Sequence, residues 1–283
     1  LVDAVRGTRT ALVLRPELNG ELDGSLALWG RKPSSAALAV VFSLARVRNA
    51  LLGRTDAVIA ISRAIAEEAA ASGFPASRVR HIPHGIDMTE YAPADPELRR
   101  ARRRALKLPE DKQLVTYTGR LIQGKGLETL FEAWRALRDV PDLHLVIVGS
   151  GAGQVISIED RLRASAAEPD LAGRITFTGR LDDIPSVLQA SDLFVFPTLD
   201  EALGMSAVEA QACGLPAVAS RTGGVPDVVE DGATGLLVPP RNSVELAAAL
   251  RRLVLDEALR RRFALAARER AVAEFSRQTM ITR

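Results

Sequence analysis

The sequence has a single cysteine among its 283 residues, so Cys213 forms no disulfide within the chain and no zinc site built from several thiolates. Aromatic residues make up only 4% of the composition, too few for a surface that stacks nucleic-acid bases. No stretch of about 18 residues is both apolar and free of charge, so the pattern contains no membrane-spanning helix. Lys and Arg outnumber Asp and Glu by only 37 to 35, which gives little reason to expect a nucleic-acid partner. We expect a soluble protein in a reducing compartment, the cytoplasm.

Short apolar runs alternate with helical patterns along most of the chain, which is typical of parallel strands joined by crossover helices. Several runs lack polar residues altogether and therefore suit strands that are buried on both faces. The sequence predicts strands at 10–14, 57–61, 79–82, 114–118, 143–148, 175–178, 193–196, 217–219 and 235–238. It predicts helices at 63–72, 127–137, 184–190, 205–213 and 244–253. The fold class is α/β.

A stretch rich in proline and then in charge lies between residues 87 and 112 and indicates a boundary between two domains. We assign residues 1–93 to the remainder of an N-terminal domain, 94–111 to a linker and 112–283 to a C-terminal domain. The first of these contains only three predicted strands, fewer than a doubly wound sheet needs, so we expect it to be incomplete. The arginine run at 99–104 is interpreted as a solvated face.

Two cations lie among glycines where residues 118–126 join a predicted strand to the next helix. Such a loop lies at the carboxyl edge of a parallel sheet, where glycines let the backbone approach an anion and the helix amino terminus adds positive potential. Arg120 suits a forked contact with phosphate oxygens and Lys125 adds a point charge, so the loop indicates a diphosphate site. It lacks the Gly-Lys-Ser/Thr order of a Walker loop. The alternative is a surface loop with two solvated cations.

A second strand end, loop and helix at residues 197–210 carry two glutamates, Glu201 on the loop and Glu209 about one turn inside the helix. Carboxylates accept hydrogen bonds from sugar hydroxyls, and the first amides of the helix, from Gly204 to Ser206, suit an anion. The alternative is a turn residue followed by an ordinary exposed helix residue.

Both constellations, in this order, resemble the donor domain of GT-B glycosyltransferases of family four. The first matches as Gly119-Arg120-Leu121 followed by Lys125-Gly126, and the second as paired glutamates with Gly204 between them. The resemblance begins near residue 57 and continues to the end of the chain. Further segments that resemble the family lie at 59–63, 83–87, 179, 212–216, 223–227 and 231–237. Residues 257–270 resemble the start of a helix that returns to the first domain.

The resemblance implies a GT-B fold, in which two Rossmann-like domains with doubly wound parallel sheets face a cleft, the first of them incomplete here. It also implies a retaining glycosyltransferase that moves a sugar from a nucleoside diphosphate sugar to a glycan, a lipid-linked or a small-molecule acceptor. No cofactor and no essential metal are expected, because cations and helix dipoles replace the ion. Peripheral contact with the inner face of the membrane stays an open alternative to a purely cytoplasmic location.

The resemblance assigns catalysis to Arg120, Lys125 and Glu201. In it, Glu209 accepts the ribose hydroxyls, Glu201 holds the transferred sugar and Leu181 lies beside the nucleobase. The full set of donor-binding residues that it implies is Gly119, Arg120, Lys125, Leu181, Glu201, Gly204, Met205, Ser206 and Glu209.

One feature departs from the family, because the histidine that related enzymes carry after an early strand is missing from residues 14–20. Either Arg15 or Asn19 substitutes, or the sugar is held differently, while His84 borders the cleft or is an ordinary turn residue. Other functions considered are a noncatalytic or inactive fragment that binds nucleotide sugars and, less favoured, an epimerase or phosphorylase of the same fold. A dehydrogenase, suggested by the glycines at 149–153, is excluded by their spacing.

Overall fold

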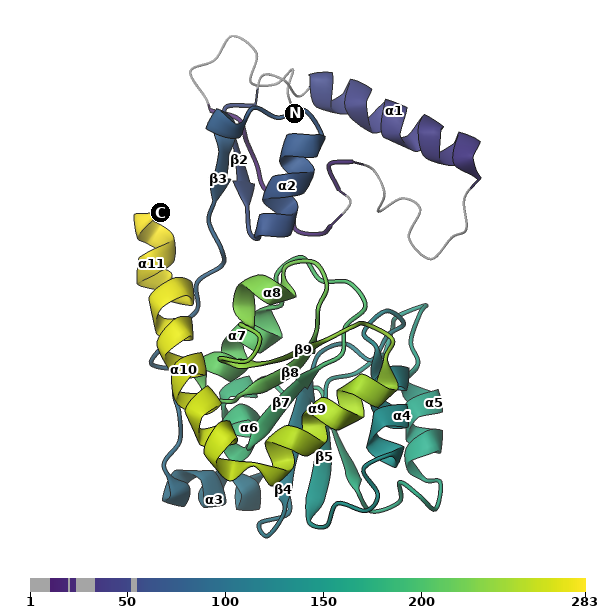
Figure 1. The fold of residues 1–283 in the computed structure, drawn as a ribbon, viewed down its shortest axis with the longest axis vertical. Helices are drawn as coiled ribbons and strands as arrows, with labels where there is room; N and C mark the ends of the chain where they lie inside the picture. Colours follow the sequence, from purple (N-terminus) through teal and green to yellow (C-terminus); the bar gives the residue numbers. More distant parts are fainter. Residues whose placement is uncertain (1–10, 20, 24–33, 52–54) are drawn as a thin grey trace.

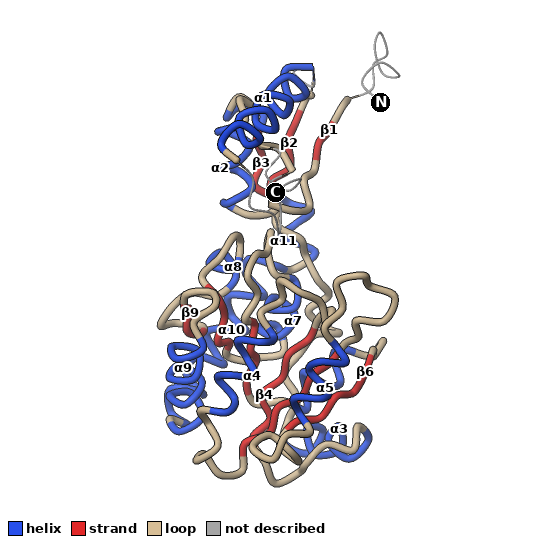
Figure 2. Tube along the Cα trace, turned by 90° about the vertical axis from the view of Figure 1, so that its right-hand side faces the viewer, coloured by secondary structure: helices blue, strands red, loops and turns tan. Residues whose placement is uncertain are grey.

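The computed structural model describes residues 11–19, 21–23, 34–51 and 55–283, and they form two parallel sheets in separate lobes (Figures 1 and 2). The smaller sheet has the order β1-β2-β3, with β1 (Val13–Leu14), β2 (Ala57–Ala60) and β3 (Val79–His81). Residue 10, the first of the predicted opening strand, lies outside the described residues. The α/β fold class is confirmed.

The larger sheet has the order β6-β5-β4-β7-β8-β9, so the chain starts in the middle, winds outward in one direction and then returns to wind in the other. Its strands are β4 (Gln113–Thr118), β5 (Leu143–Val148), β6 (Ile175–Gly179), β7 (Leu193–Phe196), β8 (Ala217–Ser220) and β9 (Gly235–Val238). Every residue of β5, β7, β8 and β9 is buried, as the apolar runs predicted. The winding direction changes between β4 and β7, whose pairing is parallel.

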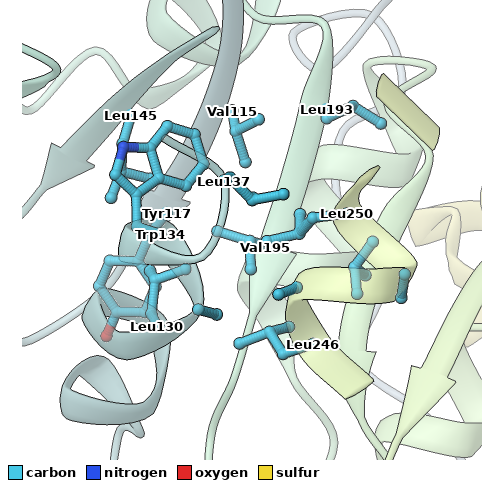
Figure 3. Packing of buried hydrophobic residues seen from close by; sticks show 14 of the residues in the cluster. Val115, Tyr117, Leu130, Trp134, Leu137, Leu145, Leu193, Val195, Leu246 and Leu250 are labelled. Atoms are coloured by element: carbon cyan, nitrogen blue, oxygen red, sulfur yellow. The ribbon is translucent and has the colours of Figure 1, made fainter. Parts of the chain in front are cut away.

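Helices cover both faces of this sheet. On one side lie α4 (Leu127–Arg135), α5 (Glu159–Ala166) and α9 (Ser243–Leu255). On the other lie α6 (Ile184–Ala190), α7 (Met205–Ala212) and α8 (Val225–Val228). Trp134 and Tyr117 are the largest fully buried side chains and fill the first layer (Figure 3). This close packing makes the sheet and the loops at its edge a rigid support for side chains placed there.

The smaller lobe adds α1 (Ser35–Leu51), α2 (Arg63–Ala71) and the short 3-10 helix η3 (Ala76–Arg78) to its sheet. The Ser62 hydroxyl caps α2 by accepting from the amide of Ile65 at 3.3 Å. Helix α1 was not among the helices predicted from the sequence. Its apolar residues lie on both faces of the helix, with Ala45 buried and Leu44 exposed, so no single apolar stripe marks it.

The chain passes between the lobes at Ile86, which pairs with the segment that leaves α10 (Glu257–Phe275) for α11 (Arg277–Thr282). The Ile86 amide donates to the carbonyl oxygen of Phe275 at 2.9 Å, and the Arg277 amide donates to that of Ile86 at 3.0 Å. Helix α10 packs on α7 and then points toward the smaller lobe (Figure 1). Two crossings held together by backbone bonds therefore join the lobes.

The segment 94–111, predicted as a linker, is folded onto the larger lobe. It contains α3 (Pro96–Ala105), which packs against α6. The Arg103 guanidinium is buried, where it donates to an Asp192 carboxylate oxygen at 2.7 Å and to the carbonyl oxygen of Ala190 at 2.9 Å. The prediction of a solvated arginine face is therefore wrong for Arg103, because a buried carboxylate and carbonyl groups meet its donors.

Across the ranges described, no helix is both long enough and apolar enough to cross a membrane.

Candidate functional site

The loops that follow β4 and β7 meet at the point where the sheet changes winding direction, which is where open α/β sheets bind ligands. The Leu199 amide donates to the carbonyl oxygen of Gly124 at 2.9 Å and joins the two loops. Gly126, at φ +69°, begins α4 so close to β7 that an added Cβ would lie 1.8 Å from the carbonyl oxygen of Pro197. Only glycine fits there, so the two loops are held in contact.

An ion pair spans the two loops. The Lys125 ammonium lies 2.7 Å from a carboxylate oxygen of Glu201, and each side chain is 20% exposed. The sequence predicted both residues in one site, as ligands of different parts of a donor, but did not predict that they pair with each other. At the edge of the sheet where ligands bind, this half-buried pair offers an ammonium group that can bind an anion and a carboxylate that can accept hydrogen bonds from hydroxyls.

Arg120 lies on the same loop, with its side chain exposed. Within the described part of the chain, no hydrogen bond or ion pair engages its guanidinium, while its carbonyl oxygen accepts from the buried Tyr117 hydroxyl at 3.1 Å. Burial raises the pKa of that hydroxyl, so Tyr117 stays a neutral donor. The buried Tyr117 hydroxyl thus fixes the loop backbone, and the Arg120 guanidinium is available to a ligand.

Arg120 lines a pocket of about 540 Å³ with the ends of β5 and β6. Leu181 and Ile184 supply apolar surface, and the glycine-rich loop after β5 forms the opposite wall. The Ser150 hydroxyl and the Gly151 amide both donate to the Glu159 carboxylate, at 2.8 and 2.7 Å, which fixes this wall. The complete lining is Gly119, Arg120, Val148, Gly149, Ser150, Ala152, Gln154, Arg180, Leu181 and Ile184. Apolar surface beside a free guanidinium suits a planar base joined to phosphates.

Helix α7 begins at Gly204, which has φ +101° and caps the helix without a side chain. The amides of Met205 and Ser206 are therefore among the unsatisfied donors at the helix start. These amides follow Glu201 by only a few residues, so they lie where the loop that carries the ion pair enters α7. Among the described residues, no group of three His, Cys, Asp or Glu side chains is arranged to hold a metal ion.

Glu209 lies on α7, half-buried, and no ion pair or hydrogen bond to its carboxylate occurs within the described residues. Burial, and secondarily the nearby Glu90 carboxylate, raise the pKa of Glu209 to about 7. Its carboxylate is an acceptor to which none of the described residues donates. Glu209 is thus poised between its charged and neutral forms near pH 7.

The smaller lobe contributes two groups of side chains at the carboxyl edge of its own sheet. The Arg15 guanidinium lies 3.1 Å from His84 Nε2, which in turn lies 3.3 Å from a Glu17 carboxylate oxygen. Asn19 instead reaches the larger lobe, where its amide donates to Asp200 Oδ1 at 2.6 Å. Of the two residues considered as substitutes for the missing histidine, Asn19 is thus the one beside the loop that carries Glu201. Nothing in the spacing of the sequence indicated this contact.

Comparison with known proteins now gives the family. The model for glycosyl transferases group 1 matches residues 99–270, which is more than half of the chain. The chain belongs to this family. The model for glycosyltransferase family 4 matches residues 30–90 in the smaller lobe.

D-inositol 3-phosphate glycosyltransferase from Mycobacterium tuberculosis is 35% identical over 168 residues, which make up 59% of this chain and 34% of that protein. This chain therefore spans about a third of the length of the curated relatives that it matches. Anabaena HepE in complex with UDP-glucose superposes with a TM-score of 0.82 at 26% identity, over 99% of this chain and 72% of HepE. Sucrose-phosphate synthase from Thermosynechococcus elongatus superposes with a TM-score of 0.81 at 28% identity, over 99% and 67% of the two chains. The predicted GT-B fold is confirmed.

Proposed function

We propose that this chain carries the donor site of a glycosyltransferase that moves a sugar from a nucleoside diphosphate sugar to a hydroxyl of a glycan, a lipid-linked or a small-molecule acceptor. The observation that carries the proposal is the Lys125–Glu201 pair at the switch point of the sheet. A diphosphate is recognised by cations and a sugar by carboxylate acceptors, and here the two kinds of group lie 2.7 Å apart. The similarity to HepE, which was crystallised with UDP-glucose, supports a uridine donor.

In the reaction, the bond between the anomeric carbon and the diphosphate oxygen breaks, a bond from that carbon to the acceptor oxygen forms, and the proton of the acceptor hydroxyl passes to the leaving diphosphate. Negative charge then grows on the leaving diphosphate. Arg120, Lys125 and the amides of Gly204, Met205 and Ser206 are the groups we assign to stabilise it. When a diphosphate binds, Lys125 exchanges part of its contact with Glu201 for a phosphate oxygen, which leaves the Glu201 carboxylate for the sugar hydroxyls.

The nucleoside half of the donor fits the remaining features. We assign the base to the pocket beside Leu181 and Ile184, where apolar surface lies next to the Arg120 guanidinium. We assign the ribose hydroxyls to the unpartnered carboxylate of Glu209. Retention of configuration and independence of metal ions are further parts of the proposal. They rest on the likeness to the family and on the cations of the loop, which supply the charge of an ion.

A second candidate function is a noncatalytic nucleotide-sugar-binding protein, and an epimerase of the same fold is a third. The noncatalytic candidate keeps the same donor site, so binding alone does not separate it from a transferase. Products do: a transferase releases a nucleoside diphosphate and a glycosylated acceptor, an epimerase returns an isomeric nucleotide sugar, and a binding protein returns its ligand unchanged.

A cytoplasmic location with peripheral membrane contact is also part of the proposal. Helix α1 supports it, because the apolar side chains of Val40, Leu44 and Val47 are each more than half exposed. Cosedimentation with anionic vesicles tests this contact. Loss of binding when Leu44 and Val47 are both changed to Ser would support it, and equal binding by the two proteins would contradict it.

The experiment that tests the proposed function measures turnover of UDP-glucose through the UDP that is released. Arg120→Ala and Lys125→Ala are the variants. Arg138→Ala and Lys112→Ala are matched controls, since Arg138 is exposed beyond α4 and Lys112 lies at the opposite edge of the sheet. Each loop variant should lose about 2 kcal/mol of transition-state stabilisation, about 30-fold in kcat/KM, while the controls change little. Equal rates in loop and control variants would contradict the assignment.

A further inference from the structure

The two lobes touch at the loop that carries Glu201. The Asn19 amide, from the loop after β1, donates to Asp200 Oδ1 at 2.6 Å and to the carbonyl oxygen of Glu201 at 3.0 Å. Asn19 and Glu201 are 182 residues apart in the chain and lie in different lobes. The contact therefore exists only when the lobes are close together.

Both the backbone carbonyl oxygen and the side-chain carboxylate of Glu201 are held by contacts. Its carbonyl oxygen also accepts from the Gly224 amide at 2.9 Å, while its carboxylate meets Lys125 at 2.7 Å. The neighbouring Gly223 leaves no space: an added Cβ would lie 2.0 Å from the carbonyl oxygen of Glu201 and 2.5 Å from the Asn19 amide nitrogen. A shift of Asn19 is thus transmitted to the backbone of Glu201.

A second contact between the lobes lies on the same side of the site. Asp227 of α8 accepts from the Arg63 amide at the start of α2, at 2.5 Å, and so caps a helix of the other lobe. The side chain of Asp227 is only 11% exposed. Two contacts consequently join the lobes. One links Asn19 to the loop that carries Glu201, and the other links the start of α2 to Asp227 on α8.

The polar atoms of Asn19 indicate what the residue contributes. Its amide nitrogen makes two contacts across the lobes, whereas its buried Oδ1 has no partner within the described part of the chain. A buried acceptor without a donor destabilises a fold, so an asparagine here costs stability that an apolar residue would not. Such a residue is expected where a function requires its donor.

We propose that Asn19 is a positioning residue of the transferase, which fixes the backbone of Glu201 when the lobes close and thereby directs the Glu201 carboxylate toward the transferred sugar. This inference rests on the proposed function. It assigns to the smaller lobe a role on the donor side of the reaction, in addition to any contact with the acceptor. Nucleotide binding involves Arg120, Lys125 and Glu209 and does not depend on Asn19.

The first test needs no turnover. In Asn19→Leu, the amides of residues 199–206 should exchange with deuterium about tenfold faster in the ligand-free chain, because the loop loses its contact with the other lobe. Gln189→Leu is the matched control: its amide on α6 likewise donates to a backbone carbonyl oxygen, that of Ala92, at 3.1 Å, and its Oε1 likewise has no partner within the described part of the chain. Unchanged exchange in Asn19→Leu, or an equal increase in both variants, would overturn the inference.

The second test separates positioning from binding. Asn19→Leu should lower kcat with UDP-glucose about tenfold and leave the Kd of UDP within about twofold. Asn19→Asp removes the donor and sets two carboxylates against each other, so it should lower kcat further. Adding Asp200→Asn returns a donor to the pair and should recover part of the loss. If the wild-type chain turns over UDP-glucose and these variants do so equally, the inference fails while the proposed function stands. If the wild-type chain does not bind UDP, the proposed function fails.

Discussion

In the proposed donor site, the pKa of Glu209 should make the affinity for a nucleotide sugar depend on pH. Burial raises that pKa to about 7, and ribose hydroxyls donate to the charged form of the carboxylate. Binding therefore requires the ionised form, and affinity must rise as the pH passes upward through 7. The sign is opposite to that expected for a histidine that binds phosphate only when protonated.

The magnitude follows from the pKa. At pH 6 about a tenth of the Glu209 side chains are ionised and at pH 8 about nine-tenths, so the association constant should rise about tenfold, or about 1.4 kcal/mol. At pH 7 about half a proton should leave the protein for each nucleotide sugar bound. Both quantities are large enough to measure in one titration series.

Calorimetry of UDP-glucose binding at pH 6, 7 and 8, in buffers with different ionisation enthalpies, measures the affinity and the proton release together. UDP-glucose is preferred to UDP because the terminal phosphate of UDP itself titrates near pH 6. The matched control is Glu209→Gln, which keeps an acceptor and removes the titration, so its affinity should be lower at pH 8 and independent of pH. An affinity that rises equally in wild type and variant, or that falls with pH, would refute the assignment of Glu209 to the ribose.

Two further predictions concern the loops of the switch point. Glu201→Gln should reduce turnover of UDP-glucose by about 2 kcal/mol in transition-state terms while the Kd of UDP stays within about twofold; comparable loss of UDP affinity would show that Glu201 contacts the nucleotide instead. Gly126→Ala should lower the free energy of unfolding by about 2 kcal/mol or more, because its Cβ would overlap the Pro197 carbonyl oxygen. Gly173→Ala shares a positive φ but meets open space, so it should cost only about 1 kcal/mol; equal losses in a urea titration would disprove the packing argument.

The strands of the larger sheet were predictable because burial on both faces leaves a plain mark in the sequence. The predicted bounds of β5, β7 and β9 match those observed residue by residue, and the other strands differ by only a few residues at their ends. Helix α1 was missed because its apolar residues surround the helix, so the period of 3.6 that reveals an amphipathic helix is absent. The segment of helix α3 was assigned to the linker because it is rich in proline and then in charge, and its arginines were interpreted as a solvated face, although Arg103 is paired in the interior.

The site was predictable to the extent that it follows from loops at strand ends. The glycines and cations after β4 and the glutamates around the start of α7 mark the switch point in the sequence, since parallel strands end at one edge. Contacts between residues far apart in the sequence were not predictable. The pairing of Lys125 with Glu201 depends on the β4–β7 register, and the contact of Asn19 depends on how the lobes meet. Neither leaves a periodicity or a spacing that a single sequence reveals.

The most direct test of a nucleotide-sugar site at the switch point is a calorimetric titration of the chain with UDP, GDP, ADP and CMP in the presence of a metal chelator. We expect one nucleoside diphosphate, UDP, to bind with a dissociation constant in the micromolar range without metal, and Lys125→Ala to weaken that binding by about 30-fold. A correctly folded chain that binds none of the four, or that binds UDP equally well without Lys125, would contradict the account.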